Sequence, residues 1–379
     1  MVIDSSQLNS APQQSDEELD SLTRDLPTQY ELLGKVSVGG MGSIVKVRNR
    51  YTGALSAIKV LNADASRNRE AVSRFVIEAK AASALKHPNI CRVFDFGVTE
   101  QGTAYLVMDW INGIDLERKI NREQLVPPKE AIFIFQQIAA GLAYAHRHKL
   151  VHRDVKPQNI MLSGEKSGRP EVHLVDFGIA KVMEEGEDAT VRGQGVTRAG
   201  MVVGTPLFMS PEQATGAKVD NRSDIYSLGC VMYFALTGRP PFIGGSAVET
   251  VHKHLTELPP VFAPALRVPG DLQTIVFKAL EKDPDDRYVN MDELLTDLKK
   301  LSKGVSIESR RHARQRHTLK TALKSVLYFT LSFLIVFAIC TGLRYLTETP
   351  GSNTATKESH SQENNKRLEQ PEKTQTQDK

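Results

Sequence analysis

Short apolar runs divide the first part of the chain into predicted β-strands. Val, Ile, Leu and Tyr gather in stretches of a few residues, and glycine or polar residues bound each stretch. The first two runs flank a turn that contains Gly39, Gly40 and Gly42, which indicates a strand, a glycine-rich turn and a second strand. The predicted strands cover residues 30–34, 43–47, 56–59, 105–108, 160–162 and 172–175.

Apolar residues at spacings of three and four predict helices. Residues 74–85 are rich in helix formers, with Phe75, Ala79 and Ala82 on one stripe. His87-Pro88 is expected to end this helix, because a residue before proline resists the α conformation. Further helices are predicted over residues 129–147, the apolar part of 220–238, and residues 247–256, 271–281 and 291–301.

The composition of the chain changes after residue 301. Basic residues recur through residues 302–324, and the next 19 residues, 325–343, carry no charge. At about 1.5 Å per residue such a helix is about 28 Å long, close to the hydrocarbon core of a bilayer. A buried core helix is the alternative, but the polar flanks offer no core to enter. The pattern predicts one membrane span over residues 325–346, with the basic side in the cytoplasm.

The two ends of the chain are polar. Residues 1–29 form an acidic arm, and residues 347–379 form a tail that is poor in aromatic residues. Both are expected to be disordered, although the arm could also dock a partner. No apolar run follows a basic start at the N-terminus, so a cleavable signal peptide is not expected.

Composition narrows the class of protein. Hydrophobic residues make up 40% of the chain and charged residues 25%, which suits a globular core. The net charge of +3 is too small to indicate a nucleic-acid partner. Cys91, Cys230 and Cys340 are far apart, so they form neither a metal-ligand cluster nor a disulfide framework, and a reducing compartment fits the globular part.

The strongest chemical signal is residues 151–159, Val-His-Arg-Asp-Val-Lys-Pro-Gln-Asn. Asp154 can accept the proton of an attacking hydroxyl, and Asn159 can bind a metal ion on nucleotide phosphates. Lys156 is close enough to Asp154 to meet charge on a transferred phosphate. A chance surface turn is the alternative, since Asp, Asn and Pro are common in loops.

Other segments carry matching chemistry at suitable distances. Glycines in the 39–42 turn let the backbone approach phosphate oxygens, although an ordinary turn without a ligand would have the same residues. Lys59 lies inside an apolar run, where a lysine either snorkels outward or has a buried partner, and Glu78 on the next helix is the candidate partner. Glu78 alone would equally be a solvated helix carboxylate.

Three later features complete the series. Residues 109–113 follow a buried-type strand and indicate a hinge, where backbone groups from Asp109 to Ile111 would contact an adenine and Met108 would guard the back of its pocket. Asp176-Phe177-Gly178 comes seventeen positions after Asn159. A long loop over residues 179–203 then ends in Gly204-Thr205-Pro206 and Ser210-Pro211-Glu212. Arg287 is either a brace for Glu212 or an ordinary surface arginine.

Taken together, residues 30–301 resemble the eukaryotic-like (Hanks-type) serine/threonine protein kinases, specifically their bacterial, membrane-anchored branch. Five or more motifs occur in the order and spacing of that family. The Gly-Gly-Met-Gly turn, His-Pro-Asn-Ile, Gly-Thr-Pro and Ser-Pro-Glu-Gln are typical of the bacterial branch. Lys156 and the Gly204-Thr205 pair match the serine/threonine pattern rather than the tyrosine pattern.

The resemblance implies an α+β, two-lobed protein-kinase fold, with a small β-rich lobe, a larger helical lobe and ATP between them, followed by one transmembrane helix. Asp154 corresponds to the base, Lys59 to the lysine on the phosphates, Glu78 to its partner, and Asn159 and Asp176 to the Mg²⁺ ligands. Lys156 completes the catalytic set. The expected nucleotide-binding residues are Ser37, Val38, Gly39, Gly40, Gly42, Ile44, Ala57, Lys59, Met108, Asp109 and Ile111.

Two departures from the family pattern affect regulation and nucleotide binding. Thr197 matches one autophosphorylation position, with Arg153 as the reader of its phosphate and Thr205 nearby, but a second common threonine is Ala199 here. Ser37 stands where the first glycine of the loop is expected, and its side chain could weaken the cover over the phosphates.

The sequence therefore predicts a membrane-bound kinase with a cytoplasmic kinase domain. It would transfer the γ-phosphoryl group of ATP to protein serine or threonine, and it could form a homodimer. The alternative is a membrane-tethered pseudokinase that acts as a docking scaffold, for which Ser37 is the one argument. The physiological substrates and the activating signal cannot be derived.

Overall fold

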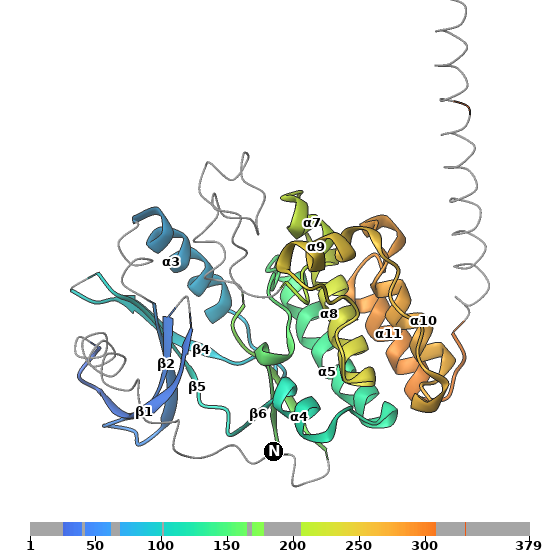
Figure 1. The fold of residues 1–379 in the computed structure, drawn as a ribbon. Helices are drawn as coiled ribbons and strands as arrows, with labels where there is room; N and C mark the ends of the chain where they lie inside the picture. The colour runs from blue at the N-terminus through green and yellow to red at the C-terminus, as the bar shows by residue number, and fades with distance from the viewer. Residues whose placement is uncertain are drawn as a thin grey trace, which may run out of the picture. The chain divides into compact units, whose positions relative to one another are not determined.

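The computed structural model describes residues 26–39, 42–61, 69–100, 102–164, 169–177 and 206–307, together with Thr330. Within residues 26–307, strands dominate the first part and helices the second (Figure 1). The described residues thus form a small β-rich lobe and a larger helical lobe, as the sequence predicts.

A five-stranded antiparallel sheet forms the β-rich lobe, in the order β1-β2-β3-β5-β4. Apolar residues occupy both of its faces. Buried Phe75, Ala79 and Ala82 on helix α3 (Arg69–Ser83) join the main core, whereas Leu26 and Tyr30 pack against a second cluster centred on Ile58. The strands are β1 (Tyr30–Gly39), β2 (Gly42–Asn49), β3 (Leu55–Leu61), β4 (Val93–Val98) and β5 (Ala104–Asp109).

Helix α8 (Asn221–Thr237) is the centre of the helical lobe, since every residue from Ser223 to Leu236 is buried. Asp220 caps its start, and Gly238 ends it with φ 73°. A Cβ at Gly238 would lie 2.3 Å from the carbonyl oxygen of Gln124, so glycine is required there. The helices around it are α4 (Leu116–Glu123), α5 (Pro128–Arg147), α7 (Pro211–Thr215), α9 (Ala247–Thr256), α10 (Gly270–Ala279) and α11 (Met291–Ser302).

A second sheet of three short strands lies in the helical lobe, in the order β6-β7-β8. Its strands are β6 (Gly113–Asp115), β7 (Ile160–Ser163) and β8 (Glu171–Leu174), and all neighbours are antiparallel. The predicted catalytic loop connects α5 to β7, and Asp176 follows β8. The two segments with the strongest chemical signals are therefore fixed at one end of the same small sheet.

The predicted helices agree with the structure to within a few residues, except at α3. That helix begins at Arg69 and already ends at Ser83, before the proline signal at His87-Pro88. Strands β4 and β6 and helices α4 and α7 were not predicted. β4 buries just one of its six residues fully and β6 has three residues, so neither has a clear apolar period.

Across the described residues, no helix combines the length and apolar composition that a membrane crossing requires. The predicted span over residues 325–346 lies outside the described residues, apart from Thr330. The same holds for residues 1–25 of the predicted acidic arm and for the predicted tail over residues 347–379. These three expectations stay predictions.

Candidate active site

The loop from Val151 to Asn159 is anchored from below by Asp224 on α8. The carboxylate of Asp224 accepts hydrogen bonds from the backbone N–H groups of His152 and Arg153, each at 2.8 Å, and from Nε2 of His146 at 2.7 Å. Burial acts to raise the pKa of Asp224, but the contacts with His146 and His152 outweigh it and lower the pKa. A buried carboxylate thus sets the backbone path of the loop.

His152 is the buried link between this loop and the segment around Asp176. Its side chain is fully buried, and burial lowers its pKa, so the ring is neutral. Nε2 donates to the carbonyl oxygen of Val175 at 3.1 Å, and Nδ1 accepts from the backbone N–H of Asp154 at 3.4 Å. The ring of Phe177 lies 4.6 Å from the His152 ring. His152 therefore acts as a spacer that fixes the two segments.

Three of the predicted catalytic and metal-binding side chains meet at Asp154. Oδ2 of Asp154 accepts from Nζ of Lys156 at 2.8 Å and from Nδ2 of Asn159 at 3.0 Å. The side chains of Asp154 and Lys156 remain 22% and 37% exposed, so a ligand can reach both. The structure brings together the groups that the sequence predicts for a base, a phosphate contact and a metal ligand.

Asp176 lies beside this group. The backbone N–H of Val175 donates to the carbonyl oxygen of Asn159 at 3.0 Å, which holds the two predicted metal ligands on adjacent segments. Oδ1 of Asp176 is 2.9 Å from Nζ of Lys59 on β3. Arg153 and Asp176 adopt positive φ values of 62° and 55°, and non-glycine residues in such strained conformations tend to occur at functional sites.

A magnesium ion fits the chemistry of this pair, because carboxylate and amide oxygens are hard ligands. Within the described part of the chain, no group of three or more His, Cys, Asp or Glu side chains is arranged to hold a metal ion. Asn159 and Asp176 would supply the protein ligands, with phosphate oxygens and water as the others. Mg²⁺ commonly binds in this way, through one or two carboxylates and substrate phosphates.

Residues predicted to surround the adenine line the sheet above the site. Ala57 and Met108 are opposite one another on β3 and β5, and both are buried. Met108 also lines a small, mostly apolar cavity with Asp176 and Phe177. Ile44 on β2 is opposite Lys59 and packs against the main core.

The hinge is more constrained than the sequence suggests. The backbone N–H of Asp109 donates to the carbonyl oxygen of Arg92 at 3.0 Å, and the carbonyl oxygen of Asp109 accepts from the thiol of Cys91 at 3.6 Å. The N–H of Asp109 is therefore not available to an adenine. Nζ of Lys46 lies 4.4 Å from the centroid of the Trp110 ring, a cation–π contact that ties β2 to the hinge.

Some of the predicted site residues lie wholly or partly outside the part of the chain that the structure describes. The backbone of Ser37, Val38 and Gly39 lies in β1, and Ser37 is exposed opposite Ile44. Gly42 begins β2. The side chain of Glu78 on α3 is not among those described, nor are Gly40, Thr197 and Thr205. The predicted pairing of Glu78 with Lys59 and the predicted roles of Thr197 and Thr205 stay predictions.

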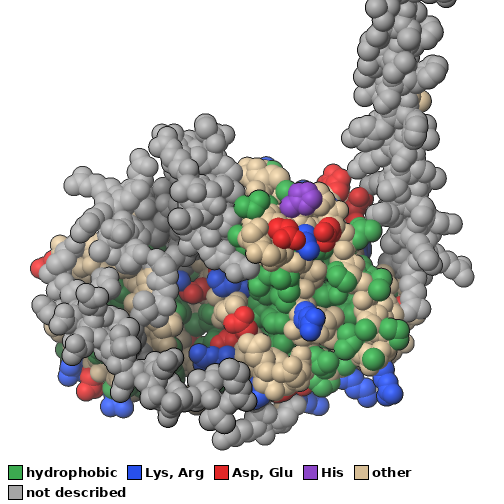
Figure 2. All heavy atoms as spheres, viewed as in Figure 1, with side chains coloured by type: hydrophobic (Ala, Val, Ile, Leu, Met, Phe, Trp, Pro, Cys, Tyr) green, Lys and Arg blue, Asp and Glu red, His purple; other side chains and the backbone are tan. Residues whose placement is uncertain are grey.

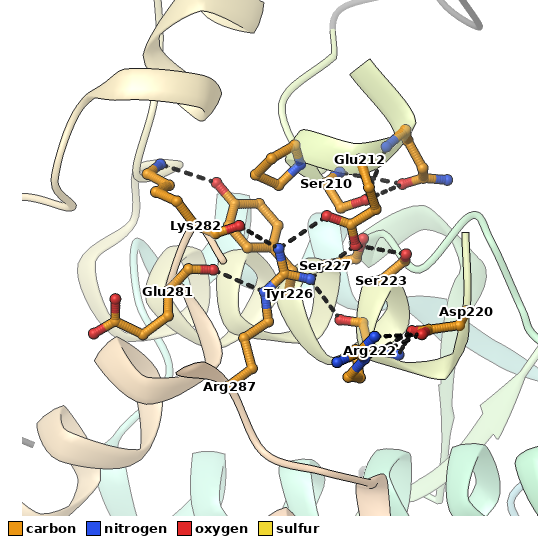
Figure 3. Close-up of polar contacts among 12 residues, drawn as sticks. Ser210, Glu212, Asp220, Arg222, Ser223, Tyr226, Ser227, Glu281, Lys282 and Arg287 are labelled. Atoms are coloured by element: carbon orange, nitrogen blue, oxygen red, sulfur yellow. Dashed lines mark hydrogen bonds and ion pairs between the residues drawn. The ribbon is translucent and has the colours of Figure 1, made fainter. Parts of the chain in front are cut away.

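Arg287 and Glu212 form a buried brace in the helical lobe (Figure 3). Nη1 and Nη2 of Arg287 donate to the two carboxylate oxygens of Glu212 at 2.8 and 2.9 Å. Ser223 donates to the same carboxylate at 2.6 Å. The brace predicted from the sequence is present, and the alternative of a surface arginine is wrong, because the Arg287 side chain is 0% exposed.

Helix α7 is hydrogen-bonded directly to the catalytic loop, which the sequence did not reveal. Ser210 and Gln213 form a capping box at the start of α7. Nε2 of Gln213 also donates to the carbonyl oxygen of Arg153 at 2.8 Å. The Ser210-Pro211-Glu212-Gln213 pattern was noted, but nothing in it signals a backbone partner 60 residues away.

Charged side chains gather where the β-rich lobe meets the helical lobe. Figure 2 shows acidic and basic groups on that part of the described surface, whereas hydrophobic side chains cover more of the helical lobe. The contacts around Asp154 and Asp176 place cations, the predicted metal-binding pair and a base close together. These groups can therefore bind a polyanion such as a nucleoside triphosphate next to a proton acceptor.

Comparisons with known proteins agree with this chemistry. A family model described as "Protein kinase domain" matches residues 30–298. Serine/threonine-protein kinase pkn3 of Myxococcus xanthus is 37% identical over 278 residues, which are 73% of this chain and 50% of that protein. Serine/threonine-protein kinase PknB of Mycolicibacterium smegmatis is 39% identical over 285 residues, which are 74% of this chain and 44% of that protein.

The chain thus matches half or less of the length of these two relatives. Among solved structures, the Mycobacterium tuberculosis PknI kinase domain superposes with a TM-score of 0.56 at 27% identity, over 73% of this chain and 97% of that one. This likeness confirms the predicted two-lobed fold. The chain belongs to the protein kinase family, and its relatives place it with the bacterial Hanks-type branch.

Proposed function

We propose that this chain is a protein kinase that transfers the γ-phosphoryl group of ATP to serine or threonine hydroxyls of proteins. The observation that carries the proposal is the meeting of Lys156 and Asn159 on the carboxylate of Asp154, with the Lys59–Asp176 pair on the adjoining segment. The names of the bacterial relatives support the choice of serine and threonine.

Each residue has one task in this reaction. Asp154 orients the acceptor hydroxyl and takes its proton, and Lys156 offsets the negative charge that gathers on the transferred group. Lys59 holds the nucleotide phosphates in line with the hydroxyl. Magnesium, held by Asn159 and Asp176, would neutralise phosphate charge. Positioning and charge stabilisation account for most of the catalysis.

The test is phosphate transfer from radiolabelled MgATP by the full-length protein, with dephosphorylated casein as acceptor. An Asp176→Asn variant is the matched control. Label on casein or on the protein itself, as phosphoserine or phosphothreonine and for the wild type alone, supports the proposal. MgATP binding without any transfer would refute it and favour the pseudokinase. A Ser37→Gly variant that gains no ATP affinity would remove the sequence argument for that alternative.

The proposal extends to membrane anchoring. Residues 325–343 are uncharged and follow a basic segment, which supports a single span with residues 30–301 in the cytoplasm. Membrane fractions washed at alkaline pH should retain the protein, and a variant ending at Lys324 should be released. Protease added to intact cells should leave the kinase domain uncut. Crosslinking in membranes would test self-association through the span.

Activation by autophosphorylation is the regulatory part of the proposal. Phosphate on Thr197 would pair with Arg153 and order the loop through a charge-assisted contact. Thr197→Ala should then lower casein phosphorylation. Unchanged activity, with mass spectrometry finding phosphate on Thr190 instead, would count against this role for Thr197.

A further inference from the structure

Lys282, between α10 and Arg287, holds the end of α9. Its ammonium donates to the carbonyl oxygens of His254 at 2.7 Å and Lys253 at 3.4 Å, both in the last turn of α9. It also donates to the hydroxyl of Tyr226 at 3.2 Å and lies 3.8 Å from the centroid of the Phe242 ring. A cation at this place gives the last carbonyl groups of the helix a further partner and interacts favourably with the helix dipole.

The backbone at the same position belongs to the brace (Figure 3). Nη2 of Arg287 donates to the carbonyl oxygen of Lys282 at 3.0 Å, and Nε donates to that of Glu281 at 2.7 Å. Arg287 in turn binds Glu212 on α7. Residue 282 therefore ties α9 through its side chain and α7 through its backbone.

His254 carries this connection toward the segment before α7. Its Nδ1 is 3.0 Å from the Tyr226 hydroxyl, and its ring packs 4.9 Å from that of Phe242. Burial and the adjacent Lys282 lower the pKa of His254 to about 3, so the imidazole is neutral. His254 lies on α9, and α9 packs against α7.

Residues 206–213 adjoin the catalytic loop. The hydroxyl of Ser227 donates to the carbonyl oxygen of Phe208 at 2.8 Å, and Gln213 donates to the carbonyl oxygen of Arg153. A protein chain that presents a hydroxyl to Asp154 would approach next to this segment, because Gln213 is bonded to the loop that carries Asp154. In the proposed function, the nucleotide would instead contact the β-rich lobe and the metal-binding pair.

We propose that Lys282 is a positioning residue for the protein substrate, because its ammonium holds α9 and, through His254 and Tyr226, the 206–212 segment in place. The inference rests on the proposed kinase function and deepens it. Loss of the positive charge should weaken binding of the protein substrate while leaving ATP binding unchanged. Lys282 touches neither ligand in this scheme.

The surroundings of Lys282 make this charge sensitive to pH. Burial lowers its pKa to about 8; Arg287 acts in the same direction, whereas Cys230 on α8 and the carboxylates of Glu281 and Glu257 oppose it. Of the other groups that face the ammonium, His254 on α9 is neutral and Tyr226 on α8 has a raised pKa. The positioning effect should therefore fade as the pH rises through about 8.

The contribution of Lys282 to stability changes in the opposite direction. Because its folded pKa lies below the ordinary value of 10.5, the unfolded chain binds the extra Lys282 proton between pH 8 and 10.5, and this group adds stability as the pH rises. The buried thiols of Cys91 and Cys230 act against this, because burial raises their pKa values. Thermal unfolding measured at each pH therefore separates a fall in substrate affinity from unfolding.

The experiment measures KM for dephosphorylated casein and KM for ATP between pH 7 and 9.5, using full-length wild type, Lys282→Met and Lys282→Arg. Lys278→Met is the matched control, since Lys278 binds Glu293 and the Tyr288 ring instead. At pH 7, Lys282→Met should raise the casein KM about tenfold without changing the ATP KM. Lys282→Arg should stay near wild type at pH 7 and lose the alkaline rise that the wild type shows.

Each other outcome overturns the inference. An unchanged casein KM in Lys282→Met, an equal rise in the ATP KM, or an alkaline rise that persists in Lys282→Arg would each show that Lys282 does not position the protein substrate. A wild type that transfers no phosphate at all would instead refute the proposed function itself. Thermal unfolding of every variant identifies any that fail to fold, and for Lys282→Met the arginine variant then decides.

Discussion

The site and the brace use the same kinds of charged groups but expose them differently. The side chains of Lys59 and Asp176 are 18% and 23% exposed, whereas those of Arg287 and Glu212 are 0% and 8% exposed. All five N–H donors of Arg287 are used, two by Glu212 and three by backbone carbonyl oxygens. In the site, by contrast, Asp154 and Lys156 remain partly open to solvent.

This difference shows how the chain separates chemistry from support. Charges that must meet a nucleotide are left accessible, because a fully satisfied group has nothing to offer a ligand. Charges that set the shape of the loop are buried, and burial is tolerated where hydrogen bonds are complete. Substitutions in the site should therefore reduce turnover without changing stability. Substitutions in the brace should mainly reduce stability.

The largest expected effect is at Asp154. Asp154→Asn keeps the size and the hydrogen bonds to the loop but removes the proton acceptor. Because general-base catalysis contributes about 10²- to 10⁴-fold, kcat should fall by that factor. The unfolding midpoint and the affinity for MgATP should match the wild type. A variant that loses stability instead would contradict the separation between site and support.

The brace should respond through stability. Arg287→Met leaves the Glu212 carboxylate buried without its partner, which costs about 3–5 kcal/mol of unfolding free energy. Urea unfolding can be followed through Trp110, the one tryptophan of the chain. Arg147→Met is the control, since the Arg147–Asp292 pair is 54% and 53% exposed and should be worth about 0–1 kcal/mol.

The pH dependence sharpens this prediction. Burial acts to raise the pKa of Glu212, but Arg287 and Ser223 lower it below the ordinary 4.5, so the wild-type pair stabilises the fold above that pH and the stabilisation is lost on acidification. In the Arg287→Met variant, burial raises the pKa of Glu212. Protonation of this carboxylate then removes the cost of burying an unpaired charge. The gap between the two proteins should narrow as the pH falls toward 4.5. A gap that is constant with pH would argue against a buried carboxylate.

The same comparison explains what could be predicted from the sequence. Asp154, Asn159, Asp176 and Lys59 were found because their residue types and spacing together specify one chemistry. The Glu212–Arg287 pair was also accessible, because two opposite charges at fixed places in a motif series suggest each other. Both predictions depend on side-chain identity, which the sequence shows directly.

Residues with backbone partners escaped prediction. Asp224 binds N–H groups of the loop, Lys282 binds carbonyl oxygens of α9, and Gln213 binds that of Arg153. Every residue carries such groups, so the sequence cannot indicate which one a side chain will meet. Strand β4 was missed for a related reason, since just one of its six residues is buried and its ladder with β5 is made by backbone groups.

Gln213 offers the finest test of how far the support reaches into catalysis. Gln213→Glu keeps an acceptor for the N–H of Ser210 and so preserves the capping box, but it removes the N–H donor to Arg153 and sets a carboxylate against that carbonyl oxygen. Since one hydrogen bond contributes about 0.5–1.5 kcal/mol, kcat should fall by about tenfold or less. Ser210→Ala is the control: it weakens the cap by about 1 kcal/mol and leaves the Gln213–Arg153 bond in place. Steady-state kinetics should show a lower kcat for Gln213→Glu and a near-normal kcat for Ser210→Ala. If the two variants lose kcat equally, the link from α7 to the catalytic loop acts through general stability rather than through the position of Arg153.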